Sequence, residues 1–202
     1  MEVQVVNSTL FPIFTIGNAA GTSTGKGKPN SSTDQQLMNR ITRCYEQGHM
    51  SVFEFADLEF YISGISRACS HQLVRHRHMS FVQQSQRYNK IYVNKNDWYV
   101  MPKMIKDDTM FIQHMRTCAA AYVNALANGV RPEDARFLLP EACKTEISVK
   151  TNLRSLFQFL DLREDMSAQW EIRDLAHSME QAAIDINDQW KFLINLRRKH
   201  ET

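Results

Sequence analysis

The spacing of hydrophobic positions changes along the chain between a period of two and a helical period. Residues 57–64, DLEFYISG, alternate, with Leu58, Phe60 and Ile62 on one side and Asp57, Glu59 and Tyr61 on the other. This period predicts a half-buried strand. Residues 2–6 alternate more loosely and predict a short strand, and residues 80–93 also have an extended pattern.

Helical signals dominate the remaining sequence. Thr33 as an N-cap, Gln36 as its capping-box partner and Gly48 as a stop predict one helix. Further helices are expected over residues 66–76, residues 107–128 with Gly129 as the stop, a short segment between Pro132 and Pro140, residues 151–160, and residues 168–196. The apolar positions predicted to be buried in the last two are Leu153, Leu156, Phe157, Leu160, Ile172, Leu175, Met179, Ala183, Ile186 and Trp190.

Residues 17–36 interrupt these patterns, because they are rich in Gly, Ser, Thr and Lys and lack large apolar side chains. We expect a long, flexible surface loop there, and an active-site lid and an inert insertion are equally compatible with it. No internal repeat and no linker divides the sequence. The elements predict a single α+β domain over residues 1–202, with an antiparallel β-sheet flanked by helices.

Composition narrows the classes of function. The 202 residues carry a formal net charge of only +2, so bulk attraction to nucleic acid or to a membrane is not expected. The four cysteines include no C-x-x-C pair, which argues against a zinc or redox motif. We see neither a basic leader nor a run long enough to span a membrane. These features predict a cytoplasmic protein with free thiols and no metal.

Positive charge is concentrated in the segment RHRHMSFVQQSQRY, residues 75–88, which contains no carboxylate. Its guanidinium groups suit phosphates and carboxylates, and its amides and hydroxyls suit a base edge and a sugar. If residues 83–87 are extended, Gln83, Ser85 and Arg87 share one face. Apolar residues flank the segment on both sides. This composition favours a nucleotide pocket over a metal site.

Three other interpretations stay open at this point. A basic run is most often a solvated face. The segment also suits a nucleic-acid-binding module in which Phe81 and Tyr88 stack on bases. A metal hydrolase would have to use the histidines His49, His71, His76 and His78, whose spacing matches no ligand motif that we can justify.

Five blocks in order resemble one known family. The triplet Arg75–Arg77, followed after seven residues by Ser85 and continuing as SQRY, is the signature of flavin-dependent thymidylate synthases. GHMSVFEF at residues 48–55 resembles the family's upstream block, and ARFLLP at residues 135–140 resembles its A-R-x-x-L-P block. TNLRSLFQFLDLR followed by AQWEI resembles the end of its active site. The matches extend from about residue 46 to residue 173.

The resemblance implies the reaction and its partners. The enzyme would methylate dUMP to dTMP with methylenetetrahydrofolate as the carbon donor, and FAD reduced by NADPH would supply the hydride. The family works as a homotetramer whose active sites are shared between subunits. No nucleic acid or membrane is implied. Because dUMP, FAD and folate are anionic and planar, the expected ligands agree with the cationic segment.

The resemblance also assigns roles to single residues. The residues that match flavin contacts are Ser51, Glu54, Arg75, His76, Arg77, Gln83, Asn152, Leu153, Arg154 and Gln158. Those that match dUMP contacts are Gln72, Leu73, Val74, Arg75, Gln83, Gln84, Ser85, Gln86, Arg87, Arg136 and Arg163. Arg163 resembles the catalytic arginine that contacts the uracil and favours loss of its N3 proton. A fixed guanidinium there stabilises developing negative charge, so no protein nucleophile is needed.

Several positions depart from the family pattern. Phe55, Gln83, Gln158 and Ser167 stand where histidine, glutamate, asparagine and histidine can occur. Gly21 stands where an Ala-Ala-Arg run has its arginine, so we assign no site residues to the 17–36 segment. Cys143 is assigned to packing, because nothing in the sequence marks it as an activated thiolate.

Overall fold

The computed structural model describes residues 1–25, 32–93, 97–105 and 108–198. The chain forms two compact units. The first unit contains Met1 and residues 62–75 and 82–147, and the second contains residues 2–61, 76–81 and the chain from residue 148 onward. The assignment of residues 1–202 to a single domain stays a prediction.

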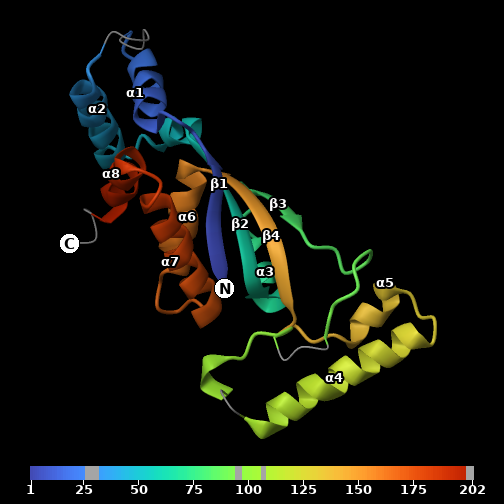
Figure 1. Ribbon diagram of the computed structural model, residues 1–202. Helices are drawn as coiled ribbons and strands as arrows, with labels where there is room; N and C mark the ends of the chain where they lie inside the picture. Colours follow the sequence, from blue (N-terminus) through green and yellow to red (C-terminus); the bar gives the residue numbers. More distant parts are fainter. Residues whose placement is uncertain (26–31, 94–96, 106–107, 199–202) are drawn as a thin grey trace. The chain divides into compact units, whose positions relative to one another are not determined.

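A four-stranded antiparallel sheet has the strand order β1-β2-β4-β3 (Figure 1), which together with the helices confirms the predicted α+β class. Its strands are β1 (Glu2–Ser8), β2 (Asp57–Ser66), β3 (Ser80–Gln83) and β4 (Lys144–Asn152). The helices are α1 (Pro12–Thr22), α2 (Asp34–Glu46), η1 (Met50–Phe55), α3 (Arg67–Leu73), η2 (Lys103–Ile105), α4 (Thr109–Ala127), α5 (Pro132–Ala135), η3 (Arg136–Leu138), α6 (Leu153–Arg163), α7 (Trp170–Ile184) and α8 (Asp188–Arg198). No helix in the described part of the chain is long and apolar enough to cross a membrane.

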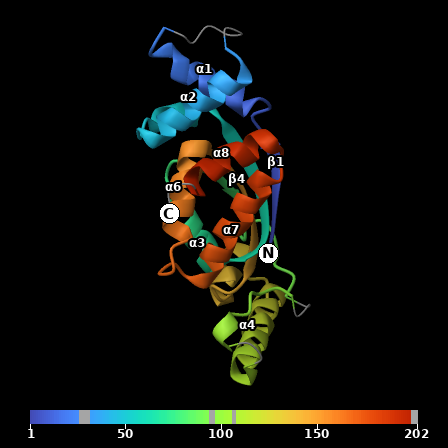
Figure 2. The same ribbon diagram turned by 90° about the vertical axis from the view of Figure 1, so that its left-hand side faces the viewer.

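The core of the second unit lies among β1, α6, α7 and α8, which Figures 1 and 2 show next to one another. The predicted stripe of α6 is confirmed, because Leu153, Leu156, Phe157 and Leu160 are all buried. At roughly 25 cal/mol for each Å² of apolar surface removed from water, such a stripe is the main reason why α6 is held against its neighbours η1 and α7. The contacts of this stripe therefore fix the position of α6 in the second unit.

The first unit has a smaller core, built by α4 and the segments around it. Trp98, Met115, Tyr122 and Cys143 are buried there against one another. Asp108 caps α4 by accepting hydrogen bonds from the backbone N–H groups of residues 110 and 111. The stop at Gly129 is confirmed by its φ of +82°, a conformation that a side chain would strain.

The predicted loop over residues 17–36 is wrong for its first part. Residues 17–22 belong to α1, and residues 26–31 lie outside the described residues. Gly17 explains the error, because a Cβ there would lie 2.8 Å from Cβ of Leu37 on α2. The glycine permits close packing of two helices, whereas composition alone suggests a flexible turn. The capping box of Thr33 and Gln36 that opens α2 is confirmed.

Gly17→Ala should lower the stability of the folded chain. The added methyl group overpacks the α1–α2 contact, with an expected loss of about 1–2 kcal/mol in the free energy of unfolding. Urea denaturation measures it. In a Leu37→Gly background the same change should cost much less, since both Leu37 atoms that lie 2.8 Å from the added methyl group are gone. An equal cost in both backgrounds would show that the contact does not limit packing.

Two further predictions are corrected by the structure. The helix expected over residues 168–196 is two helices, because Asn187 accepts hydrogen bonds from the N–H groups of Gln189 and Trp190 and caps α8. Ile186 lies between the helices and is only half-buried. The extended segment expected over residues 80–93 forms a strand only as far as Gln83. Strand β4 was not predicted, although its alternate residues are buried.

Candidate active site

In the second unit, the predicted flavin residues other than His76, Arg77 and Gln158 come from η1 and from the junction of β4 with α6. The backbone N–H of Leu153 donates to the carbonyl of Ala56 at 2.9 Å, which joins the β4–α6 junction to the end of η1. Asn152 caps α6 by accepting a hydrogen bond from the N–H of Ser155 at 2.9 Å. Arg154 Nη1 pairs with Glu54 Oε1 at 2.5 Å. These backbone and capping bonds fix the backbone positions from which the side chains of Glu54 and Arg154 extend.

A cavity of about 920 Å³ in this unit is lined by two of the predicted flavin residues, Ser51 and Arg154. Its other walls include Thr22 and Ser23 at the C-terminal end of α1, together with His49. Thr22 and Ser23 have no predicted role, because they fall in the segment that was expected to be a loop, and His49 was considered only as a metal ligand. A helix ending in two hydroxyl residues beside the η1 block is the signal that could have found them. Such a cavity is large enough for a cofactor-sized ligand.

His76 and Arg163, both in the second unit, are joined directly. Arg163 Nε donates to His76 Nε2 at 3.0 Å, which leaves the ring proton of His76 on Nδ1. The edge of the imidazole meets buried Phe159, with 4.9 Å between ring centroids. Burial, and secondarily the positive charge of Arg163, lower the pKa of His76 to about 4. At neutral pH the imidazole is therefore uncharged and fixed in one tautomer.

In the first unit, hydrogen bonds fix the start of the predicted dUMP segment. Gln83 Nε2 donates to Ser70 Oγ at 2.8 Å and to Thr145 Oγ1 at 3.2 Å. The N–H of Gln84 donates to the carbonyl of Glu146 at 2.9 Å. Arg67, for which the sequence predicted no role, donates from Nη1 to the carbonyl of Gln84 at 3.4 Å. A role of Gln83 toward a ligand would have to use its Oε1, since its amide nitrogen already bonds within the protein.

The shared face expected for Gln83, Ser85 and Arg87 is wrong, because the strand ends at Gln83 and the chain turns. Ser85 Oγ accepts a hydrogen bond from the N–H of Arg87 at 3.1 Å, and its carbonyl accepts one from Asn89. Arg87 Nε pairs with Glu133 at 2.7 Å. A hydroxyl that bonds to its own backbone favours a turn over continued strand.

The remaining predicted residues differ in exposure. Gln72, Val74 and Arg136 are half-buried, and Gln158 is exposed on α6. Leu73 and Leu153 are fully buried, and the backbone N–H of Leu153 already bonds within the protein. Gln86 Nε2 lies 3.7 Å from Cys143 Sγ. All assignments of these residues to a ligand stay predictions.

Arg75 and Arg77 are exposed, and the described residues include no carboxylate that forms an ion pair with either guanidinium. Other arginines behave differently, since Arg87 and Arg154 both pair with acids. An arginine without an acidic partner keeps its full positive charge for an anion. The structure therefore retains the cationic character that the sequence of the 75–88 segment predicted.

The family model for the thymidylate synthase complementing protein matches residues 4–186. A flavin-dependent thymidylate synthase of Pyrococcus furiosus is 40% identical over 188 residues, which cover 89% of this chain and 77% of the relative. The enzyme of the same name from Geobacter sulfurreducens is 48% identical over 138 residues, or 65% of this chain and 58% of the relative.

Solved structures support the same fold. The flavin-dependent thymidylate synthase ThyX of Helicobacter pylori, crystallised with FAD and dUMP, superposes with a TM-score of 0.79 at 23% identity and covers 96% of this chain and 98% of its own. The UMP/dUMP methylase PolB of Streptomyces cacaoi, bound with 5-Br dUMP, superposes with a TM-score of 0.80 at 22% identity, covering 98% of this chain and 94% of its own. From the family model and the close relatives together, the chain belongs to the flavin-dependent thymidylate synthases.

Proposed function

We propose that the protein methylates dUMP to dTMP, with methylenetetrahydrofolate as the carbon donor and NADPH as the reductant of an FAD cofactor. One observation carries the proposal: in a chain of this family, the Arg75–His76–Arg77 triplet keeps two exposed guanidinium groups without an acidic partner among the described residues. FAD and dUMP are both phosphate-bearing, so they would supply the missing negative charge.

The second unit has residues that fit a flavin. Ser51 and Arg154 line a cavity of about 920 Å³, and Arg77 adds an exposed cation in the same unit. Neutral His76, with its proton on Nδ1, is a hydrogen-bond donor that adds no charge. When bound, FAD supplies hydride transfer, which no amino-acid side chain can perform. The protein's part is to bind, orient and polarise.

Arg163 is proposed as the catalytic residue. Its guanidinium would contact the uracil and stabilise the negative charge that develops as the N3 proton is lost, making C5 a better nucleophile toward the methylene carbon. A preorganised donor needs no reorganisation during the reaction. The hydrogen bond from Nε to His76 supports this role, because it restricts the orientation of the planar guanidinium.

The remaining proposals concern the dUMP segment and the assembly. Residues 83–87 and Arg136 would bind the phosphate, sugar and base of dUMP through amides, hydroxyls and guanidinium groups. The family resemblance supports a homotetramer with shared active sites and a cytoplasmic location.

Cys143→Ala should leave catalysis almost intact. The thiol is buried, and burial raises its pKa to about 11, so no thiolate is present at neutral pH. We expect kcat for dTMP formation within about threefold of the unchanged protein, with a stability loss of about 1 kcal/mol or more from the vacated volume. A loss of activity by a factor of hundreds in a folded variant would restore a cysteine mechanism.

A product assay tests the proposed function. The purified protein is incubated with dUMP, methylenetetrahydrofolate, NADPH and FAD, and dTMP is separated by chromatography. We expect dTMP only in the complete mixture, with no product when FAD or NADPH is omitted from flavin-free protein. A protein that forms no dTMP in the complete mixture and takes up no FAD would refute the proposal.

A further inference from the structure

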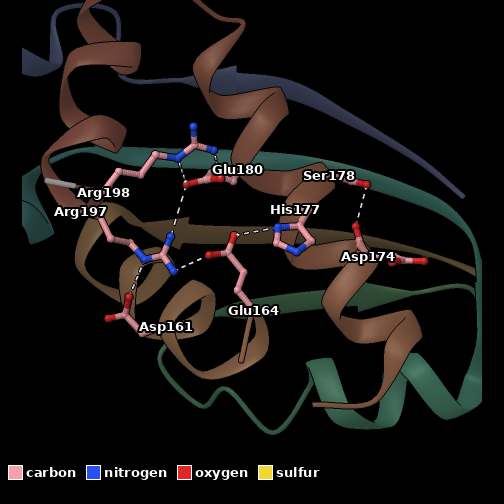
Figure 3. Close-up of polar contacts among 8 residues, drawn as sticks. All are labelled: Asp161, Glu164, Asp174, His177, Ser178, Glu180, Arg197 and Arg198. Atoms are coloured by element: carbon pink, nitrogen blue, oxygen red, sulfur yellow. Dashed lines mark hydrogen bonds and ion pairs between the residues drawn. The ribbon is translucent and has the colours of Figure 1, made fainter. Parts of the chain in front are cut away.

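A buried ionic cluster includes carboxylates on both sides of Arg163 in the sequence. Arg197 on α8 is only 4% exposed and donates from all three guanidinium nitrogens to three carboxylates (Figure 3). The acceptors are Asp161 and Glu164 on the last turn of α6 and Glu180 on α7. One side chain thus ties the end of α6 to both following helices.

Position makes this link relevant to the proposed chemistry. Asp161 and Glu164 lie two residues before and one residue after Arg163, and Glu164 is the C-cap of α6. A helix end frays readily because its last carbonyls have no partners within the helix. Two bonds to one rigid, planar guanidinium hold this turn on both sides of Arg163. The backbone from which Arg163 reaches His76 is therefore fixed by Arg197.

The same cluster offers possible metal ligands. Atoms of Glu164, His177 and Glu180 lie within 4.8 Å of one another. However, the Arg197 guanidinium already bonds to both of these glutamates, and Arg198 bonds to Glu180 as well. A divalent cation there would be repelled by two fixed positive charges at close range. The arginines take the place that a metal ion would need.

We propose that Arg197 is a positioning residue that holds Arg163 in its hydrogen bond with His76. The inference rests on the proposed function for the role of Arg163, but the link itself is a property of the folded chain. Arg197 would act through its ion pairs with Asp161 and Glu164. Arg198, its neighbour on α8, pairs with Glu180 and makes no bond to α6 in the described structure.

Arg197→Lys is the test variant, and Arg198→Lys is its matched control. Lysine keeps the charge that the buried carboxylates need, but it lacks the fork that reaches three acceptors at once. The readout is the pKa of His76, measured by NMR titration of its ring in flavin-free protein. The His76→Gln spectrum identifies its signal.

In Arg197→Lys the Arg163–His76 bond weakens, so the pKa of His76 should rise by up to about one unit, because Arg163 is the smaller cause of its low pKa. Arg198→Lys should leave it unchanged. kcat should fall roughly tenfold in the first variant only, with FAD affinity kept. An unchanged His76 pKa in Arg197→Lys, or equal shifts in both variants, would overturn the proposal.

A second variant covers the case in which Arg197→Lys does not fold. Asp161→Ala deletes a side chain that is 62% exposed, so it removes one link to α6, and Arg197 keeps its ion pairs with Glu164 and Glu180. It must raise the pKa of His76 in the same direction, and an unchanged value overturns the inference. Because the titration needs no substrate, it decides the link even if the protein forms no dTMP.

Discussion

Arg163→Ala should lower kcat for dTMP formation by about 100-fold or more while FAD binding changes by less than about threefold. The reason is the proposed contact of the guanidinium with the uracil, where charge develops only as the reaction proceeds. In the structure Arg163 Nε donates to His76, and this uncharged partner does not neutralise the positive charge of the guanidinium. Steady-state kinetics gives kcat, and quenching of flavin fluorescence gives the FAD affinity.

Arg131→Ala is the control for Arg163→Ala. It removes the same type of side chain from an exposed position whose acidic partner, Glu133, is 3.6 Å away. This variant should keep full activity, since exposed ion pairs contribute little to stability. Parallel losses of kcat and of FAD affinity in Arg163→Ala would contradict a catalytic role. They would instead indicate that the residue contributes to FAD binding.

Arg77→Gln should weaken FAD binding by roughly 10- to 100-fold, because a hydrogen bond to a charged group contributes about 1.5–3 kcal/mol. Glutamine keeps a polar side chain of similar reach and removes the charge. Arg77 is exposed and has no ion-pair partner in the described chain, so its loss should leave the fold intact. Titration of flavin-free protein with FAD gives the dissociation constant, and saturating FAD should recover much of the activity.

His78→Gln is the matched control, since His78 is the exposed neighbour to which no ligand contact is assigned. Its FAD affinity should equal that of the unchanged protein. If Arg77→Gln also binds FAD with unchanged affinity, the triplet does not serve the flavin in this chain, and the cationic segment would need another ligand.

Local patterns predicted most elements, because capping and alternation act within a few residues. Thr33, Gln36 and Gly129 each fix a helix end through their own backbone or side chain, and β2 alternates as expected. The errors arose where a contact or a cap that composition and periodicity do not reveal determines the local structure. Gly17 belongs to a helix because Leu37 packs against it, which composition cannot reveal. Asn187 breaks a continuous apolar stripe by capping α8.

For the candidate site too, the sequence predicted which residues take part, whereas contacts between distant residues could not be predicted. The resemblance named Arg163 and His76, but their shared hydrogen bond depends on how α6 meets the segment after α3, over 87 positions of sequence separation. Asp161 and Glu164 lie close to Arg163 in the sequence, and both bond to Arg197. Carboxylates near an arginine in sequence are therefore weak evidence of pairing when a third helix can supply a buried guanidinium.

A crystal structure with FAD and dUMP bound tests the central claim most directly. We expect flavin density in contact with Arg77 and His76, and a dUMP phosphate bonded to arginines of the chain, with the uracil against the Arg163 guanidinium. The opposite result is a crystal grown with saturating ligands in which neither molecule is bound and Arg75 and Arg77 are surrounded by water alone.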